Sequence, residues 1–450
     1  MKKSKLFLAI PLAFVMCLAN FSTAFAVTDT LVNADGSTPI QAAVTKILEM
    51  PVGTNIPAST FTFAVTPVSV DGDTATAKTD AMPKLGANKD NLVTINFTAG
   101  ATALTPPLAN GDAAYYVESS DIFSQVDAAF FPHAGVYVYT ITENEDTNTA
   151  IDADANQELG YSQAKYTLTI YVANLPSDDV NGPGTYIDTL VTVHNLKDDG
   201  SSAGDAKVVP NPGSGNGSGN GYSQMIFTNT YTHTNGPVDL TDPETPLANP
   251  SVPSNATLTV SNTVTGTLGN KDAYFSFSIK LTPPALQKNV PVYRAYVVDS
   301  ANNVVTSAGN GTIAGTDAEG PYMEFTKDVD TTFQLKDGQR LVFVNTAVGT
   351  GYDVKESPSD HDSSIVVTTN GEDTTPTLAS AAANALDPLD SENQLIGESD
   401  NSAAFTNTRD MVTPTGLSID DLPFVGLIVL SIGAMAAFII VKSRRRRNNI

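Results

Sequence analysis

The sequence has almost no cysteine and no tryptophan. Its one cysteine, Cys17, lies in an apolar run near the N-terminus, and none of the 450 residues is a tryptophan. If this run is a cleaved signal peptide, the rest of the chain has no thiol, which excludes disulfides as stabilising cross-links. An exported protein of this length must then depend on packing, on metals or on another kind of cross-link.

Basic residues are also scarce. Lys and Arg together number 24 against 48 Asp and Glu, which gives a formal net charge of −24 at pH 7. Without residues 1–26 and 417–450, which hold eight basic and two acidic side chains, the net charge is −30. Such a charge argues against nucleic acid as a partner. It suits a solvated surface outside the cell.

Residues for metal or phosphate chemistry are few and poorly grouped. The four histidines are scattered along the chain without the spacing of a metal site or a catalytic triad. Asp152 to Glu158 alternates oxygen ligands as calcium loops do, but it lacks their central glycine and terminal glutamate. No glycine-rich phosphate loop leads into a helix. We therefore expect no cofactor, no metal and no turnover enzyme.

Both ends of the chain carry segments directed to a membrane. Residues 1–26 combine early lysines, an apolar run and the cleavage pattern Ala24-Phe25-Ala26, which predicts a secretory signal peptide. The neighbours of Cys17 do not suit a lipoprotein signal, so this cysteine is expected to be an ordinary signal residue. Residues 417–450 contain an apolar run of 20 residues followed by an arginine cluster, which predicts a membrane span with a cytoplasmic tail.

Between these ends, short stretches alternate apolar and polar residues and are separated by turn residues. This pattern, without helical periodicity, is typical of the strands of a β-sandwich. The order of the strand patterns repeats after a proline-rich stretch. The sequence therefore predicts an all-β protein with domains at residues 27–233 and 255–410, joined by a linker at residues 234–254. Residues 376–402 read as an insertion in the second domain, which we expect to hold one short helix.

Three polar side chains are expected on the apolar faces of strands in the first domain: Lys46, Glu143 and Asn229. Burial favours the neutral amine of Lys46 and the protonated acid of Glu143. A neutral amine is a nucleophile, and a protonated carboxyl can polarise the carboxamide of Asn229 and carry a proton to the departing ammonia. The product is an amide bond between Lys46 and Asn229, made once per molecule during folding.

The residues alone leave two interpretations open. The first is this covalent bond, with Glu143 as an autocatalytic proton relay, which would close a loop of almost the whole domain. The second is a buried ion pair between Lys46 and Glu143, with Asn229 hydrogen-bonded beside it.

Together, these motifs resemble the Gram-positive pilin subunits that are built from domains with internal Lys–Asn isopeptide bonds. The resemblance covers nearly all of residues 40–416, and it implies two tandem Ig-like (Cna B-type) β-sandwiches with the Lys46–Asn229 bond in the first. The elements that carry it are Val44-Thr45-Lys46, Phe61-Thr62-Phe63, Tyr137 to Glu143 and Phe227 to Tyr231, then Leu258 to Gly266, Tyr352 to Glu356 and Phe405-Thr406-Asn407.

The second domain departs from the pattern of this family. The family would carry a lysine where this chain has Asn262, so no amine is available to react with Asn407. We therefore expect no cross-link through this site, and a hydrogen-bonded group of Asn262, Glu356 and Asn407 in its place. Lys271 and Lys280 are the nearby alternatives, and Lys280 falls one position off the inward face of its strand.

Residues 411–416 hold a further motif just before the membrane span. Val412-Thr413-Pro414-Thr415-Gly416, the apolar run and the arginine cluster together resemble a sortase sorting signal, although the leading Val-Thr departs from the common Leu-Pro. The resemblance implies that a sortase cysteine attacks the carbonyl of Thr415, releases Gly416 onward and transfers the chain to an amine. The alternative is a plain membrane anchor.

The predicted function is that of a secreted, cell-wall-anchored structural pilin subunit. Its expected partners are sortase, other pilin subunits or peptidoglycan, and the membrane only before sorting; a host or other cell-surface ligand is a further candidate. A polymerising pilin needs an acceptor lysine, and because residues 208–229 contain none, Lys207 is the nearest candidate and Lys197 the next. The alternative is a wall-anchored adhesin or minor pilin that does not polymerise.

Overall fold

The structure is a computed structural model. It describes residues 41–100, 113–123, 131–145, 147–152, 156–175, 184–211, 222–234, 258–287, 292–344, 346–381, 387–411 and 422–447. The predicted signal peptide, nearly all of the predicted linker and the sorting motif with Thr415 and Gly416 lie outside these residues.

The first domain consists of strands with two one-turn helices, α1 (Thr76–Thr79) and α2 (Thr149–Asp152). Its strands are β1 (Ala43–Pro51), β2 (Ser59–Val70), β3 (Leu92–Phe97), β4 (Ala113–Asp121), β5 (Gly135–Glu143), β6 (Gln157–Gly160), β7 (Lys165–Asn174), β8 (Thr185–Leu196), β9 (Ser202–Val208) and β10 (Ile226–His233).

These strands form two sheets that enclose one core. One sheet has the order β4-β1-β10-β6, and the other has the order β3-β2-β5-β7-β8-β9. Buried residues alternate along β2, β5 and β7, as expected for strands with one face on a core. Within the first sheet, β1 and β10 pair in parallel, so the first and last described strands of the domain lie side by side.

The second domain repeats this arrangement with more strands, and among its described residues no helix occurs. Its strands are β11 (Leu258–Thr265), β12 (Phe275–Thr282), β13 (Val292–Val298), β14 (Gly315–Thr316), β15 (Pro321–Thr326), β16 (Thr331–Leu335), β17 (Arg340–Val344), β18 (Gly351–Glu356), β19 (Asp362–Thr369), β20 (Glu372–Ala381), β21 (Leu389–Asp390), β22 (Gln394–Leu395) and β23 (Asn401–Thr408).

The larger sheet of this domain has the order β14-β15-β13-β17-β11-β23-β19-β20. The smaller sheet has the order β16-β12-β18-β21, with β22 also paired to β18. Again the first and last strands, β11 and β23, pair in parallel at the centre of their sheet. The predicted all-β class and sandwich architecture are therefore confirmed.

The expected helix in the insertion is wrong in the part that the structure describes. Ala379 and Ala381 lie on β20, which pairs with β19 along Ser363 to Thr369. Alanine favours helices locally, but pairing with the neighbouring strand β19 outweighs that weak preference. Residues 382–386 lie outside the described residues.

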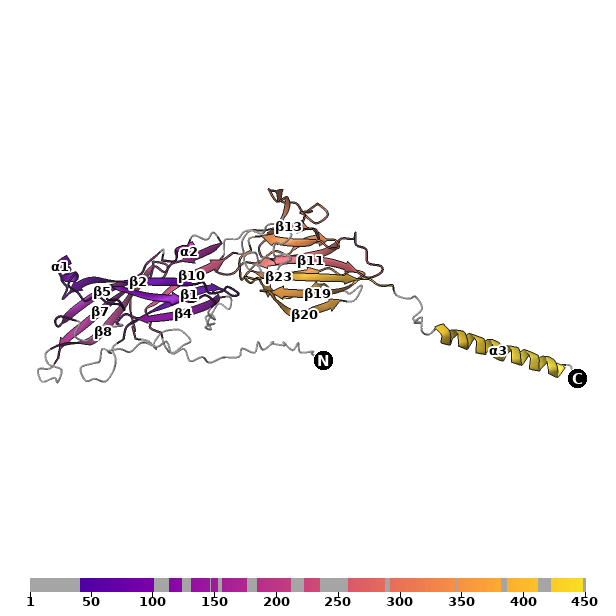
Figure 1. The fold of residues 1–450 in the computed structure, drawn as a ribbon, viewed down its shortest axis with the longest axis horizontal. Helices are drawn as coiled ribbons and strands as arrows, with labels where there is room; N and C mark the ends of the chain where they lie inside the picture. Colours follow the sequence, from indigo (N-terminus) through magenta and orange to yellow (C-terminus); the bar gives the residue numbers. More distant parts are fainter. Residues whose placement is uncertain are drawn as a thin grey trace.

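The two sandwiches follow one another along the long axis of the molecule, and α3 (Leu422–Arg447) lies beyond the second (Figure 1). At the contact between the domains, the backbone N–H and the Nδ2 of Asn55 donate hydrogen bonds of 2.6 Å to the two carboxylate oxygens of Glu398. Gly349 has φ +81°, and a Cβ there would lie 2.5 Å from the Cβ of Pro51. A glycine is therefore needed at this contact between the domains.

Candidate cross-linking site

The structure brings Lys46, Glu143 and Asn229 together in the core of the first domain. The Nζ of Lys46 lies 2.8 Å from Oε2 of Glu143, and both side chains are fully buried. The Nδ2 of Asn229, also fully buried, donates a 2.8 Å hydrogen bond to Oε1 of the same carboxyl group. Glu143 therefore links the amine and the carboxamide, one through each of its oxygens.

Strand register explains why these three side chains meet. On the parallel pair β1 and β10, Lys46 stands opposite Phe227 and Leu48 stands opposite Asn229, so the lysine and the asparagine are staggered by one inward position. Glu143 is the last residue of β5 and comes from the facing sheet, where it pairs with Phe63. Sandwich packing then sets the carboxyl group over the two strands.

Aromatic rings separate this group from water. The Nζ of Lys46 lies 4.7 Å from the ring centroid of Phe61 and 6.0 Å from that of Phe63. Burial lowers the pKa of Lys46 to about 8, although the charge of Glu143 opposes the shift. The same burial raises the pKa of Glu143, against the hydrogen bonds of Lys46 and Asn229. Both shifts favour a neutral amine beside a neutral acid, which is the reactive pair of protonation states.

The carbonyl oxygen of Asn229 is held by a group that sequence reasoning did not find. The backbone N–H of Ser162 donates a 2.7 Å hydrogen bond to Oδ1 of Asn229. The reverse orientation of the carboxamide would set its NH₂ group against this N–H, donor against donor. The structure therefore places Glu143 on the amide nitrogen of Asn229, the atom that leaves as ammonia.

Asp198 connects the residues around this N–H group. Its Oδ1 accepts hydrogen bonds from Oγ of Ser162 at 2.5 Å and from the backbone N–H of Thr228 at 2.8 Å. Its backbone carbonyl accepts from the N–H of Gln163 at 2.9 Å. One residue of the β8–β9 turn thus ties the segment before β7 to β10. A turn aspartate carries no alternation signal, so the sequence pattern could not reveal it.

The second domain holds a matching group in which Asn262 stands where the first has Lys46. Asn407 donates through Nδ2 to Oε1 of Glu356 at 2.6 Å and to Oδ1 of Asn262 at 3.0 Å. The Oγ of Ser363 donates to Oδ1 of Asn407 at 2.5 Å. The residues Asn262, Glu356 and Asn407 are each at most 1% exposed.

The two groups occupy the same register. In the second domain Asn262 stands opposite Phe405 and Val264 opposite Asn407 on the parallel pair β11 and β23, as Lys46 and Leu48 do in the first domain. Glu356 pairs with Phe277, as Glu143 pairs with Phe63. Neither alternative lysine belongs to this group. Lys271 is exposed and forms an ion pair with Asp337, and Lys280 lies off the inward face of β12.

Glu356 differs from Glu143 in the hydrogen bonding of one carboxyl oxygen. Among the hydrogen bonds of the described residues, Oε2 of Glu356 is buried and has none, whereas the corresponding oxygen of Glu143 accepts from Lys46. A buried carboxylate with an unpaired oxygen is costly, so burial favours the protonated form of Glu356. Burial accordingly raises the pKa of Glu356 to about 7.

This shift makes the second domain sensitive to pH. Because the folded state keeps a proton that the unfolded chain loses above its ordinary pKa of 4.5, the contribution to stability is complete below pH 4.5 and is lost as the pH rises through about 7. The loss amounts to about 3 kcal/mol. Calorimetry of the full chain should show the unfolding transition of the second domain falling between pH 5 and pH 8. Glu356→Gln, which mimics the protonated acid, should flatten that change; an equally steep pH dependence in this variant would contradict the assignment.

Lys207, the candidate acceptor, is exposed on β9, the edge strand of the larger sheet of the first domain. The sequence analysis did not anticipate β9 as a strand. Its burial pattern shows mostly exposed residues, so apolar alternation does not mark it. An amine at a sheet edge is accessible to a partner.

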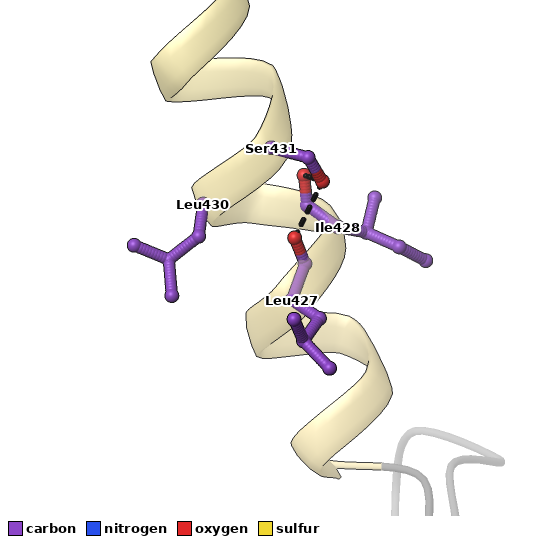
Figure 2. A pocket seen from close by; sticks show the side chains of 4 residues that line it. All are labelled: Leu427, Ile428, Leu430 and Ser431. Carbon is purple, nitrogen blue, oxygen red and sulfur yellow. Dashed lines mark hydrogen bonds between the residues drawn. The ribbon is translucent and has the colours of Figure 1, made fainter.

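The helix α3 has the length and composition of a membrane span over Gly426–Arg444, with a mean hydropathy of 2.1. A shallow hollow on its surface is lined by Leu427, Ile428, Leu430 and Ser431 (Figure 2). The hydroxyl of Ser431 donates to the carbonyl oxygens of Leu427 and Ile428, which satisfies its polarity within the helix. The hollow therefore offers apolar contact only. No group of three or more His, Cys, Asp or Glu able to hold a metal occurs among the residues described.

Comparison with known families assigns each domain separately. Residues 42–232 match the family model described as "Spy0128-like isopeptide containing domain". Residues 256–409 match the model "Domain of unknown function (DUF7601)". The boundaries of both matches agree with those of the two sandwiches.

Among curated proteins, the pilus tip adhesin Cpa of Streptococcus pyogenes is 29% identical over 192 residues. This match spans 42% of the present chain and 22% of the length of the adhesin. Among solved structures, the major pilin of Streptococcus pyogenes aligns with 83% of this chain and 100% of its own, at 19% identity and a TM-score of 0.29. The pilus-presented adhesin Spy0125 (Cpa) aligns with 55% of this chain and 36% of its own, at 16% identity and a TM-score of 0.22.

Proposed function

We propose that this chain, which is related to the Gram-positive pilins and is a pilus-type surface protein, is a structural pilin subunit stabilised by an autocatalytic bond between Lys46 and Asn229. The observation that carries the proposal is the buried contact of Glu143 with both the amine and the carboxamide. The family match of residues 42–232, named for its isopeptide bond, supports the same chemistry.

The reaction follows from the contacts. Transfer of the Lys46 proton to Glu143 gives a neutral amine, whose Nζ attacks Cγ of Asn229. The tetrahedral intermediate carries its negative charge on Oδ1. Glu143 gives its proton to Nδ2, the Cγ–Nδ2 bond breaks, and ammonia leaves. The surplus proton on the former amine passes to Glu143, so this residue begins as the carboxylate of the ion pair and ends as the neutral acid.

The bond replaces a buried ion pair with a neutral amide. Removing two charged groups from the core relieves the cost of keeping them away from water. The cross-link joins β1 to β10, the first and last described strands of the domain. It thereby fulfils, without cysteine, the stabilising role that disulfides have in other exported proteins.

Surface attachment is the second half of the proposal. The motif Val412 to Gly416 precedes the apolar helix α3, and cleavage after Thr415 by a sortase would transfer the chain to an amine of peptidoglycan or of another subunit. Lys207 is the proposed acceptor for polymerisation, since it is exposed on an edge strand. The second candidate function, favoured by the curated match to a pilus tip adhesin, is an anchored subunit that does not polymerise.

Polymerisation is tested on cells that express the chain together with its sortase. The subunit is expected to form a ladder of covalent multimers on denaturing gels, and Lys207→Ala should collapse the ladder because the acceptor amine is gone. Lys197→Ala is the matched control and should leave it intact. Thr415→Ala should abolish both ladder and wall attachment. A wall-linked monomer from the unsubstituted chain would instead favour the adhesin, and a ladder that survives Lys207→Ala would exclude this acceptor.

A further inference from the structure

We infer that the backbone N–H of Ser162 stabilises the oxyanion of the cross-linking reaction and that Asp198 is the positioning residue that holds this N–H on Asn229. The inference rests on the proposed Lys46–Asn229 chemistry and adds two residues to it. Neither residue is needed for the bond in its simplest form, which requires only an amine, an acid and a carboxamide.

The cross-linking reaction develops negative charge in its transition state. Attack on Cγ moves negative charge onto Oδ1 of Asn229, and Glu143 cannot stabilise that charge because its oxygens contact Nζ of Lys46 and Nδ2 of Asn229. The backbone N–H of Ser162 donates a 2.7 Å hydrogen bond to that oxygen, and it also interacts with the carboxyl group of Glu143. This distance matches the range over which oxyanion donors act.

The backbone N–H of Ser162 is held in place by Asp198. Ser162 lies in the segment between β6 and β7, outside the ladder of either strand, and its direction is fixed by neighbours. Asp198 accepts a hydrogen bond from the Ser162 hydroxyl through Oδ1 and another from the N–H of Gln163 through its backbone carbonyl. The same Oδ1 accepts a hydrogen bond from the N–H of Thr228, which precedes Asn229 in β10. One carboxylate therefore fixes donor and acceptor relative to each other.

The charge of Asp198 acts against the reaction. Its negative charge raises the pKa of Lys46, against the effect of burial. It therefore disfavours the neutral amine that the reaction needs. A benefit from Asp198 requires that its hydrogen bonds accelerate the reaction by more than its charge slows it. Glu143 is the other charged group acting on Lys46. Two further titratable side chains lie nearby: Tyr166, which is in edge contact with Phe227, and His194, whose ring stacks on that of Tyr166.

These effects can be separated by two substitutions at one position. Asp198→Asn keeps an oxygen acceptor but removes the charge, whereas Asp198→Ala removes both. At a pH where the Lys46 amine is neutral in all chains, the rate of ammonia loss in Asp198→Ala is expected to fall on the order of 10-fold to 100-fold, because the donor is no longer held in place. Asp198→Asn should recover most of the rate, and the midpoint of its pH–rate profile should move to lower pH because the Lys46 amine is neutral at lower pH.

The measurement uses the full chain made in a cell-free system with detergent and quenched into acid at intervals. Intact mass follows the loss of ammonia, about 17 Da, and protease resistance at the same time points follows folding. Asp188→Ala, an exposed change on β8, is the control. If Asp198→Ala does not fold, Ser162→Ala replaces it and should slow the reaction more than Asp188→Ala; it loses the hydroxyl contact to Asp198 and the hydrogen bond that this hydroxyl accepts from the N–H of Ala164.

The outcomes separate the inference from the function on which it rests. A natural chain that never loses ammonia overturns the proposed bond. A natural chain that loses it, with Asp198→Ala reacting at the same rate after folding, overturns the positioning role alone. Equal slowing in Asp198→Ala and Asp198→Asn also overturns it, because charge rather than geometry would then be responsible.

Discussion

Replacing Lys46 with methionine is expected to abolish the cross-link and to lower the melting temperature of the first domain by about 10–20 °C. Methionine has a similar length, no charge and no nucleophile, so it fills the space between Phe61 and Phe63 without leaving a cavity. Glu143 can remain protonated beside it. The loss therefore reports the covalent bond rather than an unpaired buried charge, which would add its own cost.

The size of the effect follows from the loop that the bond closes. A cross-link from Lys46 to Asn229 spans nearly the whole domain, and the chain-entropy relation for disulfides gives roughly 5 kcal/mol for a loop of that length. In a domain of this size each kcal/mol corresponds to roughly 2–4 °C. The unfolded state is the one affected, because β1 and β10 already lie side by side in the folded domain.

Mass spectrometry and calorimetry on the same samples check this result. The natural chain should weigh about 17 Da less than its summed residues, and Lys46→Met should show no such deficit. Lys78→Met, an exposed change on α1, is the matched control and should keep both the deficit and the melting temperature. A natural chain whose tryptic peptides bearing Lys46 and Asn229 appear unjoined would contradict the cross-link.

The sequence could place the three reacting residues because strands have a period of two. Lys46, Glu143 and Asn229 each follow apolar neighbours at alternate positions, so their inward direction was readable from β1, β5 and β10 alone. The parallel pairing of β1 with β10 was not readable in the same way. That pairing joins residues about 180 positions apart, and only the folded sandwich determines it.

The residues that were missed act without such a pattern. Ser162 contributes its backbone N–H, a group that every residue except proline possesses, and Asp198 lies in a turn whose composition predicts only a turn. β9 was missed because it is an exposed edge strand, and β20 was mistaken in part for a helix because of its alanines. Local sequence propensity therefore does not predict features that depend on strand pairing or on a single backbone N–H group.

Asn262→Lys is expected to create a second isopeptide bond, between position 262 and Asn407. The register of β11, β23 and β18 repeats that of β1, β10 and β5, so the new amine would extend toward Glu356 as Lys46 extends toward Glu143. The unpaired Oε2 of Glu356 is the hydrogen-bond acceptor that this amine needs. With its pKa near 7, Glu356 can also exchange the proton that the reaction moves.

Success depends on whether the core can admit the longer side chain. Extra methylene groups in a packed core cost about 1–3 kcal/mol, and the hydrogen bond from Asn262 to the carbonyl of Leu335 is lost. The bond should offset this, since the loop from position 262 to Asn407 is also long and the same entropy relation gives roughly 5 kcal/mol. We therefore expect a net rise in the melting temperature of the second domain.

Intact mass distinguishes the outcomes without relying on stability. The variant should show a deficit of about 34 Da, two ammonia molecules, against about 17 Da for the natural chain. Asn262→Met supplies the same bulk without an amine, and Asn262→Lys combined with Asn407→Ala supplies the amine without an acceptor; both should stay at the natural deficit. If the lysine variant folds and its deficit does not grow, then matching register and an acid are insufficient. The difference between the domains would then lie in the carbonyl donor, since Asn407 is held by the hydroxyl of Ser363 where Asn229 is held by a backbone N–H.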